Sequence, residues 1–228
     1  MVIDLDRCIG CGACEVACYA ENNIPVLGPG PMLNGREMSW LKVPPYRHQY
    51  EAQRVGFLPL PCQHCDAAPC EPVCPVFAAV HNDQGLNAQI YNRCIGTRYC
   101  SNNCPYKVRR FGWFDPLWRE PLNLQLNPDV TVRCRGVMEK CTFCIQRIHY
   151  HERMARIERR PLRDGEIQPA CVQSCPTRTF VFGDLMRPDS EVSRLFGHLR
   201  RYQLLKKLNT KPAVLYLKRV KPERPLLA

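Results

Sequence analysis

The feature that most limits how this chain can fold is a spacing of cysteines that recurs four times. Each motif opens with two positions three residues apart and closes with two cysteines four residues apart. The third motif breaks the pattern, because a threonine stands where a cysteine is expected. The motifs are Cys8, Cys11, Cys14 and Cys18; Cys62, Cys65, Cys70 and Cys74; Cys94, Thr97, Cys100 and Cys104; and Cys141, Cys144, Cys171 and Cys175.

These spacings are variations on the run C-x2-C-x2-C-x3-C-P, which holds iron–sulfur clusters in bacterial ferredoxins. Two residues between cysteines let a short loop place its sulfurs around one cluster, with backbone N–H groups turned inward. After three more residues the chain has made a helical turn, so the last sulfur points toward a neighbouring cluster. Proline has no N–H to satisfy, and it follows three of the four motifs, at Pro75, Pro105 and Pro176.

Other uses of the 16 cysteines fit this pattern less well. No basic and apolar leader precedes Cys8, so we expect a chain loaded with clusters in the cytoplasm, where disulfides are rare. A zinc ribbon closes four ligands into one tetrahedron and has no use for the repeated final pair. No CxxC is followed by histidine, as covalent haem requires, and no G-x-G-x-x-G indicates a flavin or nicotinamide domain.

The basic composition does not by itself indicate nucleic-acid binding. The formal net charge is +11, but this count treats every thiol as neutral. Four clusters with about two negative charges each would reduce it to about +3, so much of the arginine is counter-charge. We therefore predict no nucleic-acid partner. A nucleic-acid-processing cluster protein stays an alternative, which a steep salt dependence of DNA binding would favour.

The long interval between Cys144 and Cys171 resembles the iron–sulfur subunits of the complex iron–sulfur molybdoenzyme family. Spacing alone leaves two arrangements open, in which fourth cysteines are exchanged between adjacent motifs or between nested ones. In that family the pairing is nested, the first motif with the fourth and the second with the third. The resemblance, which covers about residues 1–185, therefore implies three [4Fe–4S] sites: Cys8, Cys11, Cys14 and Cys175; Cys18, Cys141, Cys144 and Cys171; and Cys62, Cys65, Cys70 and Cys104.

Cys74, Cys94 and Cys100 remain for a fourth site, in which Thr97 occupies the vacant ligand position. A threonine hydroxyl is a poor iron ligand near neutral pH, because it would have to ionise. A [3Fe–4S] cluster is the expected occupant, which brings the chain to about fifteen irons. Cys134 lies outside every motif, and we interpret it as a free, partly buried thiol. The alternative is that Cys134 supplies the missing fourth ligand.

Three stretches, 58–75, 91–111 and 136–148, indicate which members of the family this chain resembles most. They are similar to the iron–sulfur part of alternative complex III and to the equivalent subunit of the quinone reductase complex of sulfate reducers. This resemblance implies an electron-transfer subunit of a respiratory or photosynthetic complex. Its partners would be a molybdopterin-oxidoreductase-like large subunit and a quinone-interacting, multi-helix membrane subunit beside the [3Fe–4S] cluster. A multihaem cytochrome c subunit is a further partner that the resemblance allows.

The resemblance also implies a peripheral position at the outer face of the cytoplasmic membrane, with export alongside a partner. No apolar run approaches the about twenty residues that span a bilayer. The alternative is a cytoplasmic-side subunit of a molybdoenzyme reductase or dehydrogenase acting on a sulfur compound or similar substrate. A third class, an aconitase-like lyase, needs acid–base residues around an open iron, and only Arg98 and Tyr99 stand beside Thr97. We predict no catalytic residue.

The predicted fold is α+β, with two ferredoxin-like modules, one inserted in the other, many loops and a C-terminal helix. One module takes residues 1–60 plus 134–185 and two [4Fe–4S] clusters, and the other takes residues 61–110. The 21 prolines and 13 glycines favour short elements. We expect strands at 56–60 and 179–183 and short helices after each motif.

Three further segments have their own predictions. Residues 111–133 form a loop, rich in aromatic residues and proline, that either packs on its own module or contacts a partner subunit. Residues 145–160 form a basic helix with His149 and His151 on its surface. In the C-terminal segment 186–228, an amphipathic helix over 191–208 begins at an N-cap, Asp189 or Ser190, and a strand or extended arm over 213–220 follows.

Overall fold

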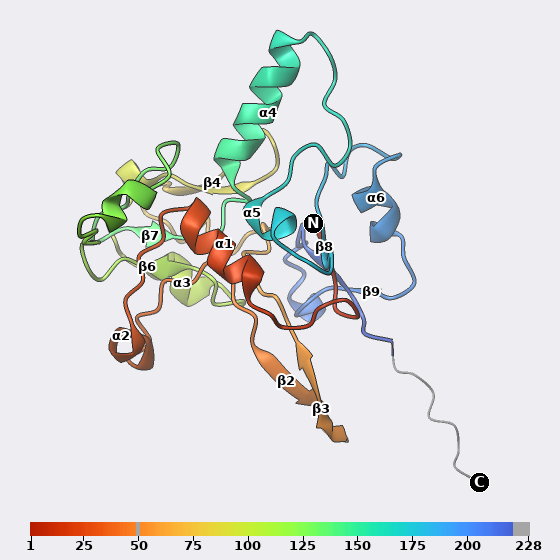
Figure 1. The fold of residues 1–228 in the computed structure, drawn as a ribbon, viewed down its shortest axis with the longest axis horizontal. Coiled ribbons are helices and arrows are strands. Elements are labelled where there is room, and N and C mark those ends of the chain that lie inside the picture. The colour runs from red at the N-terminus through yellow and green to blue at the C-terminus, as the bar shows by residue number, and fades with distance from the viewer. Residues whose placement is uncertain (49–50, 221–228) are drawn as a thin grey trace.

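Short elements joined by long loops make up the computed structural model, which describes residues 1–48 and 51–220 (Figure 1). The elements in chain order are β1 (Val2–Asp4), α1 (Ala13–Glu21), α2 (Pro29–Leu33), β2 (Pro45–His48), β3 (Glu51–Phe57), β4 (Ala79–His81), β5 (Asn87–Gln89), η1 (Tyr91–Arg93), α3 (Tyr99–Asn103), β6 (Arg110–Phe111), η2 (Leu122–Gln125), β7 (Met138–Glu139), α4 (Ile145–Ile157), α5 (Ala170–Gln173), β8 (Phe180–Val181), α6 (Glu191–Phe196), β9 (Arg201–Tyr202), η3 (Lys206–Leu208) and β10 (Leu215–Leu217). The mixture of small sheets, short helices and loops confirms the predicted α+β class.

A four-stranded sheet joins the N-terminus to the C-terminal part of the described chain, in the order β8-β1-β10-β9. The strand β1 runs parallel to β10, with Val2 opposite Leu215, and antiparallel to β8, with Val2 opposite Val181. Val192 of α6 packs against this sheet and is fully buried. The predicted strand over 179–183 is confirmed by β8.

Three two-stranded pairs carry the remaining strands, β2 with β3, β4 with β5 and β6 with β7. The predicted strand over 56–60 is mostly wrong, because β3 ends at Phe57 and only an isolated bridge between Lys42 and Leu60 follows. The prolines at positions 59 and 61 lack the N–H that a longer ladder would need.

The C-terminal helix begins as predicted but ends early. The Ser190 hydroxyl accepts a hydrogen bond from the backbone N–H of Ser193 at 3.2 Å, which is the expected N-cap. The helix stops at Phe196, with Gly197 as its C-cap, and the chain then turns into β9. The predicted helix over 191–208 is therefore wrong beyond Phe196, and Leu199 is fully exposed. Leu215–Leu217 confirms the strand predicted over 213–220 and lies inside the sheet.

Short helices were expected after each motif, but in three of the four motifs the helix begins inside the motif and contains cysteines of that motif. Helix α1 contains Cys14 and Cys18 and packs against α5, which contains Cys171. Helix α3 contains Cys100. The predicted basic helix is confirmed by α4, which ends at Ile157, projects from the body and carries His149 on its exposed side (Figure 1). The second motif has turns instead of a helix within the described chain.

The loop over 111–133 is partly tied to the body. The Asn23 side-chain amide donates to the carbonyls of Asn127 and Val130 at 2.9 and 2.7 Å. Leu117 and Leu124 nevertheless stay 87% and 82% exposed. One end of the loop thus packs on its own module, while apolar side chains elsewhere in it remain available for a partner.

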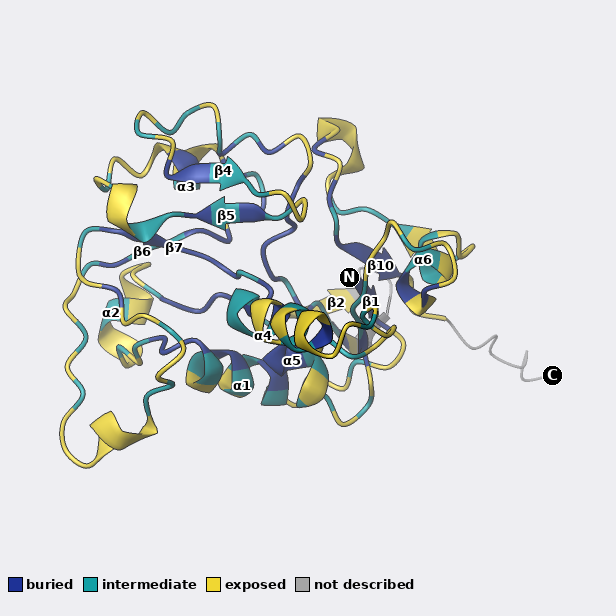
Figure 2. Cartoon of the chain, turned by 90° about the horizontal axis from the view of Figure 1, so that it is seen from above, coloured by how far each residue is buried: buried dark blue, intermediate teal, exposed yellow. Residues whose placement is uncertain are grey.

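The buried core is built around cysteines instead of aliphatic layers. Figure 2 shows the buried residues concentrated in the interior between α1, α5 and the small strand pairs, with exposed residues on the outer loops. The largest buried cluster joins cysteines from every motif with residues such as Ile24, Trp40 and Leu41. Secondary structure this short leaves room for bound groups at the centre.

Candidate iron–sulfur sites

Four copies of one loop conformation open the four motifs. In each, the residue before the second motif position has a left-handed backbone: Gly10 with φ 71°, His64 with φ 43°, Gly96 with φ 76° and Phe143 with φ 55°. Glycine adopts this conformation without strain, whereas His64 and Phe143 are held in it by their surroundings. A left-handed residue turns successive N–H groups toward the enclosed side of a loop, as in anion-binding nests.

Three motifs also share an exit turn after Cys-Pro. Phe77, Lys107 and Arg178 have φ values of 50°, 52° and 50° and stand three residues after the last cysteine of their motif. The backbone N–H of each donates to the carbonyl of that cysteine. At Cys74 and Cys175 the next N–H donates to sulfur, from Ala78 at 3.2 Å and from Thr179 at 3.3 Å. The shared turn explains the Cys-Pro sequence, because the proline position needs no donor.

The first group of thiols comprises Cys8, Cys11, Cys14 and Cys175. Burial is the largest cause that raises the pKa of Cys14 to about 12, and the charges of Cys175, Cys8 and Cys11 add to it. These side chains therefore face one another although Cys175 is remote in sequence. Cys11 is exposed, so this group reaches the surface.

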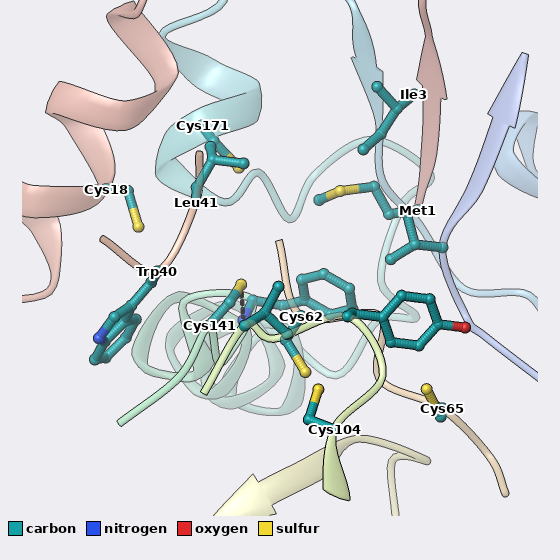
Figure 3. Close-up of a cluster of buried hydrophobic side chains, with 14 of the residues drawn as sticks. Met1, Ile3, Cys18, Trp40, Leu41, Cys62, Cys65, Cys104, Cys141 and Cys171 are labelled. Atoms are coloured by element: carbon teal, nitrogen blue, oxygen red, sulfur yellow. Dashed lines mark hydrogen bonds between the residues drawn. The ribbon is translucent and has the colours of Figure 1, made fainter. Parts of the chain in front are cut away.

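The second group comprises Cys18, Cys141, Cys144 and Cys171, which line one cavity. Burial, followed by the charges of Cys141, Cys144 and Cys171, raises the pKa of Cys18. Figure 3 shows Cys18, Cys141 and Cys171 arriving from separate parts of the chain. The N–H of Phe143 donates to Cys141 Sγ at 3.4 Å, and that of Ala170 to Cys144 Sγ at 3.4 Å.

The third group comprises Cys62, Cys65, Cys70 and Cys104, which line another cavity. Burial raises the pKa of Cys65 to about 12, despite a hydrogen bond from Thr210 that lowers it, and its three group members raise it further. Figure 3 shows Cys62, Cys65 and Cys104 of this group beside Cys141 of the second.

The fourth group contains three thiols and an alcohol. Cys74, Cys94, Cys100 and Thr97 line the same cavity. Burial is the largest influence on Cys74, but N–H groups of Val76, Ala79 and Ala78 outweigh it and lower its pKa. The N–H of Met138 donates to Cys94 Sγ at 3.3 Å.

Cys134 does not line the fourth cavity, within the part of the chain that the structure describes. Its thiol was expected to be partly buried, but Cys134 is exposed. The reason is its position in a loop that reaches solvent before Gly136 and Val137 return the chain to the body. Thr97 is also exposed, so the fourth group reaches the surface, as the first does.

Thiols of neighbouring groups lie close enough to influence one another. Cys14 of the first group is among the charges that, after burial, raise the pKa of Cys171 in the second. Burial raises the pKa of Cys141 in the second group to about 12, with the N–H of Phe143 opposing and Cys62 of the third group adding to the rise. The first three groups therefore follow one another through the protein. Arg109, which lines the third cavity and donates to Gln89 of the fourth, lies between the last two groups.

The chemistry of these groups fits iron–sulfur clusters. Several buried thiolates repel one another, so they ionise together only around a positively charged centre. Burial accordingly raises the pKa of Cys14, Cys18 and Cys65. Iron in a cluster supplies that positive charge and holds thiolates as ligands. N–H donors directed at Cys74, Cys94, Cys141, Cys144 and Cys175 stabilise the same thiolates.

The net-charge argument predicted that arginines balance the charge of the clusters, but it did not identify which charged residues are buried around these groups. Arg133 and Glu139 form an ion pair at 2.9 Å with side chains only 1% and 2% exposed. Lys140 is fully buried and donates to the Cys141 carbonyl at 2.8 Å, and Arg109 contacts Cys70. For Arg109 the run of basic residues after Cys104-Pro105 was the available signal, but nothing in it separates buried from exposed arginines.

Comparisons with known proteins agree with the cysteine pattern. A family model described as a 4Fe-4S dicluster domain matches residues 7–78, and a second model with the same description matches residues 53–119. Both matches bear out the predicted ferredoxin-like domains and favour iron–sulfur binding over zinc.

Three relatives that match nearly the whole chain are subunits of reductases, two of them named as iron–sulfur subunits. The chain is 44% identical to the iron–sulfur cluster-binding subunit of menaquinone reductase from Nitratidesulfovibrio vulgaris, over 96% of this chain and 88% of the relative. It is 30% identical to the iron–sulfur subunit of arsenate respiratory reductase from a Shewanella species, over 96% and 95% of the two chains. It is also 30% identical to one of the chains of polysulfide reductase from Wolinella succinogenes, over 93% and 90%. The chain thus belongs to the family of iron–sulfur electron-transfer subunits of the complex iron–sulfur molybdoenzymes.

Proposed function

We propose that this chain carries electrons along four iron–sulfur clusters, three [4Fe–4S] and one [3Fe–4S]. The [4Fe–4S] clusters would be held by the first, second and third groups of thiols. Cys74, Cys94 and Cys100 would hold the [3Fe–4S] cluster. When bound, the clusters supply sites that each accept and release one electron. The nested modules are part of the proposal, with residues 1–60 and 134–185 around the first two clusters and 61–110 around the others.

The proposal rests on the spatial order of the four thiol groups, which extend from one surface of the protein to another. Neighbouring groups influence each other through Cys14 and Cys171 and through Cys62 and Cys141. Only the two end groups contain an exposed motif position, Cys11 in the first and Thr97 in the fourth, among the described residues. This is the arrangement that an electron carrier between two partners requires.

The absence of a fourth thiolate supports a three-iron cluster at the last site. Thr97 occupies in its motif the place that Cys11 has in the first, after the same left-handed glycine. An alcohol binds iron poorly at neutral pH, and the exposed Cys134 does not line that cavity within the described chain. The corner of a cluster facing Thr97 would therefore lack a protein ligand.

Exposed apolar side chains surround both end groups. Ile9 and Val16, beside the first group, are 60% and 70% exposed, and Phe77, Ile95 and Tyr99, beside the fourth, are 60–69% exposed. Such side chains mark contacts with other subunits. In the proposed assembly a molybdopterin-type large subunit lies at the first group and a quinone-interacting membrane subunit at the fourth. A multihaem cytochrome c is a further candidate donor or acceptor.

No helix within the described ranges is both long and apolar enough to cross a bilayer. We propose that the chain is held at the cytoplasmic membrane by its partner subunit, on the outer face by its similarity to quinone-linked complexes. Protease accessibility of the complex in sealed spheroplasts and in inverted vesicles distinguishes this face from the cytoplasmic one.

A stopped-flow experiment on the purified complex tests the electron-transfer role. Clusters reduced through the large subunit are mixed with a menaquinone analogue, and their reoxidation is followed optically. The variant Cys74→Ser removes a ligand of the fourth site, and we expect it to stop reoxidation while the first three clusters remain reducible. The matched control Cys134→Ser changes an exposed thiol outside the groups and is expected to behave as the parent. Reoxidation at the parental rate in Cys74→Ser would contradict the proposal.

A further inference from the structure

A buried guanidinium lies between the third and fourth groups of thiols. Arg109 is 5% exposed and immediately precedes β6. Its Nη1 lies 3.4 Å from Cys70 Sγ and donates to Asn87 Oδ1 at 3.1 Å. Its Nη2 donates to Gln89 Oε1. The side chain is therefore fixed in place by two neutral amides and a ligand thiol of the third group.

The same guanidinium lies between two cavities. Arg109 lines the third cavity together with Cys62 and Cys70, and its hydrogen-bond acceptor Gln89 lines the fourth cavity together with Cys100. Burial disfavours the charged form of Arg109, but the thiolates of Cys70, Cys100 and Cys62 outweigh this effect and raise its pKa. One positive charge thus lies beside two neighbouring sites.

No carboxylate pairs with Arg109 among the side chains of residues 1–47 and 55–220, where its hydrogen-bond partners are Cys70 and two neutral amides. Its Nε is also buried without a hydrogen-bond partner within those residues. A buried charge without a counter-charge is strongly destabilising. The compensating negative charge must therefore come from the thiolates and the clusters that they hold.

The next residue provides a contrast. Arg110 forms an ion pair with Glu37 at 3.1 Å, and its Nε donates to the Ser39 carbonyl at 2.8 Å. Its charge is balanced first by this carboxylate, and the Cys104 thiol has a smaller influence on it. The two adjacent arginines thus differ in their counter-charge, which is a carboxylate for Arg110 and thiols alone for Arg109.

We propose that Arg109 raises the reduction potentials of the third and fourth clusters together, as one fixed counter-charge for both. Each cluster becomes one unit more negative when it accepts an electron. A permanent cation beside its ligands stabilises the reduced form and so makes the potential more positive. Because Arg109 faces both groups, its removal changes both potentials in the same direction. This role of Arg109 deepens the proposed function and rests on it.

Redox titration of the purified complex, followed by electron paramagnetic resonance, tests this role. The variants are Arg109→Gln, which removes the charge and keeps a hydrogen-bonding amide, and Arg109→Lys, which keeps the charge. For Arg109→Gln we expect the equilibrium constant for one-electron reduction of both clusters to fall by at least about tenfold, or about 59 mV. Arg109→Lys and the matched control Arg110→Gln are expected to shift it by less than about threefold.

The outcomes separate this inference from the proposed function. If the parent complex lacks a [3Fe–4S] cluster or a third [4Fe–4S] cluster, the proposed function fails first. If the parent has both and Arg109→Gln keeps its iron with unchanged potentials, only the role of Arg109 is overturned. If Arg109→Gln fails to assemble the two clusters, the potentials measured in Arg109→Lys decide whether the charge of this residue matters. Parental potentials in Arg109→Lys would support the charge role, and lowered potentials or absent clusters would overturn it.

Discussion

Replacing Glu139 with alanine should destabilise the protein more than the loss of any surface ion pair. The Glu139 carboxylate accepts hydrogen bonds from Arg133 Nη2 at 2.9 Å and from Trp40 Nε1 at 3.1 Å. Arg133 in turn donates to the carbonyls of Asn22 and Asn23, which follow the first motif. This ion pair therefore fastens the segment before Cys141 to the segment after Cys18.

The magnitude follows from the burial of both partners. The side chains of Arg133 and Glu139 are 1% and 2% exposed, so Glu139→Ala leaves a buried guanidinium without its counter-charge. Removing one partner of such a pair lowers the free energy of unfolding by about 3–5 kcal/mol. In a chain of this size about 1 kcal/mol shifts Tm by about 2–4 °C, which predicts a fall of about 6–20 °C.

Thermal unfolding of the cluster-loaded protein measures the effect, with circular dichroism and the visible absorbance of the clusters recorded together. Asp115→Ala is the matched control, because the Arg135–Asp115 pair is 68% and 59% exposed at 3.8 Å. An exposed pair contributes about 0–1 kcal/mol, so this variant should melt within a few degrees of the parent. If Glu139→Ala also melts that close to the parent, the argument from burial is refuted.

Three further predictions concern single positions. Thr97→Cys supplies a fourth thiolate at the last site and should replace the three-iron signal of the oxidised protein with a [4Fe–4S] cluster seen only on reduction, as electron paramagnetic resonance will show. Thermal unfolding should show that Gly96→Ala destabilises the protein more than Gly12→Ala does. Both glycines have φ 76°, but a Cβ added at Gly96 would lie 2.5 Å from the Gly136 carbonyl oxygen, whereas a Cβ added at Gly12 would have no atom within 4 Å. Burial raises the pKa of Tyr202 from 10 to about 12, so the folded state binds the phenol proton more tightly than the unfolded state does. This difference in proton binding stabilises the folded state fully below pH 10, and the stabilisation is lost as the pH rises toward 12. Denaturant unfolding at pH 9 and pH 11.5 should therefore show a larger fall in stability for the parent than for Tyr202→Phe, and equal falls would contradict the assignment.

Local chemistry made much of this protein predictable from its sequence. Cysteine spacing and the prolines after three of the motifs depend on a few neighbouring residues, and the family assignment drawn from the motifs is confirmed. The thiols that lie together in the structure come from motifs remote in sequence, which spacing alone left open. The ligand sets themselves and the three-iron cluster stay predictions.

Features set by distant contacts were not predictable. The apolar period continues through Gly197 and predicts an unbroken helix over 191–208, yet the chain instead forms β9, which pairs with β10, and β10 pairs in turn with the N-terminal strand β1. Arg109 and Arg110 are adjacent and identical in type, and only the fold directs the first toward Cys70 and the second toward Glu37. Cys134 is exposed because its loop reaches solvent, which no pattern in the sequence records.

Iron determination, combined with electron paramagnetic resonance on the oxidised and then the reduced protein, tests the four proposed clusters most directly. We expect about fifteen irons in each protein molecule, one three-iron signal when oxidised and three [4Fe–4S] signals after reduction. A silent oxidised protein with about sixteen irons would show instead that a further ligand, such as Cys134, completes the fourth site. Zinc in place of iron, or fewer than three separate clusters, would contradict the proposed path for electrons.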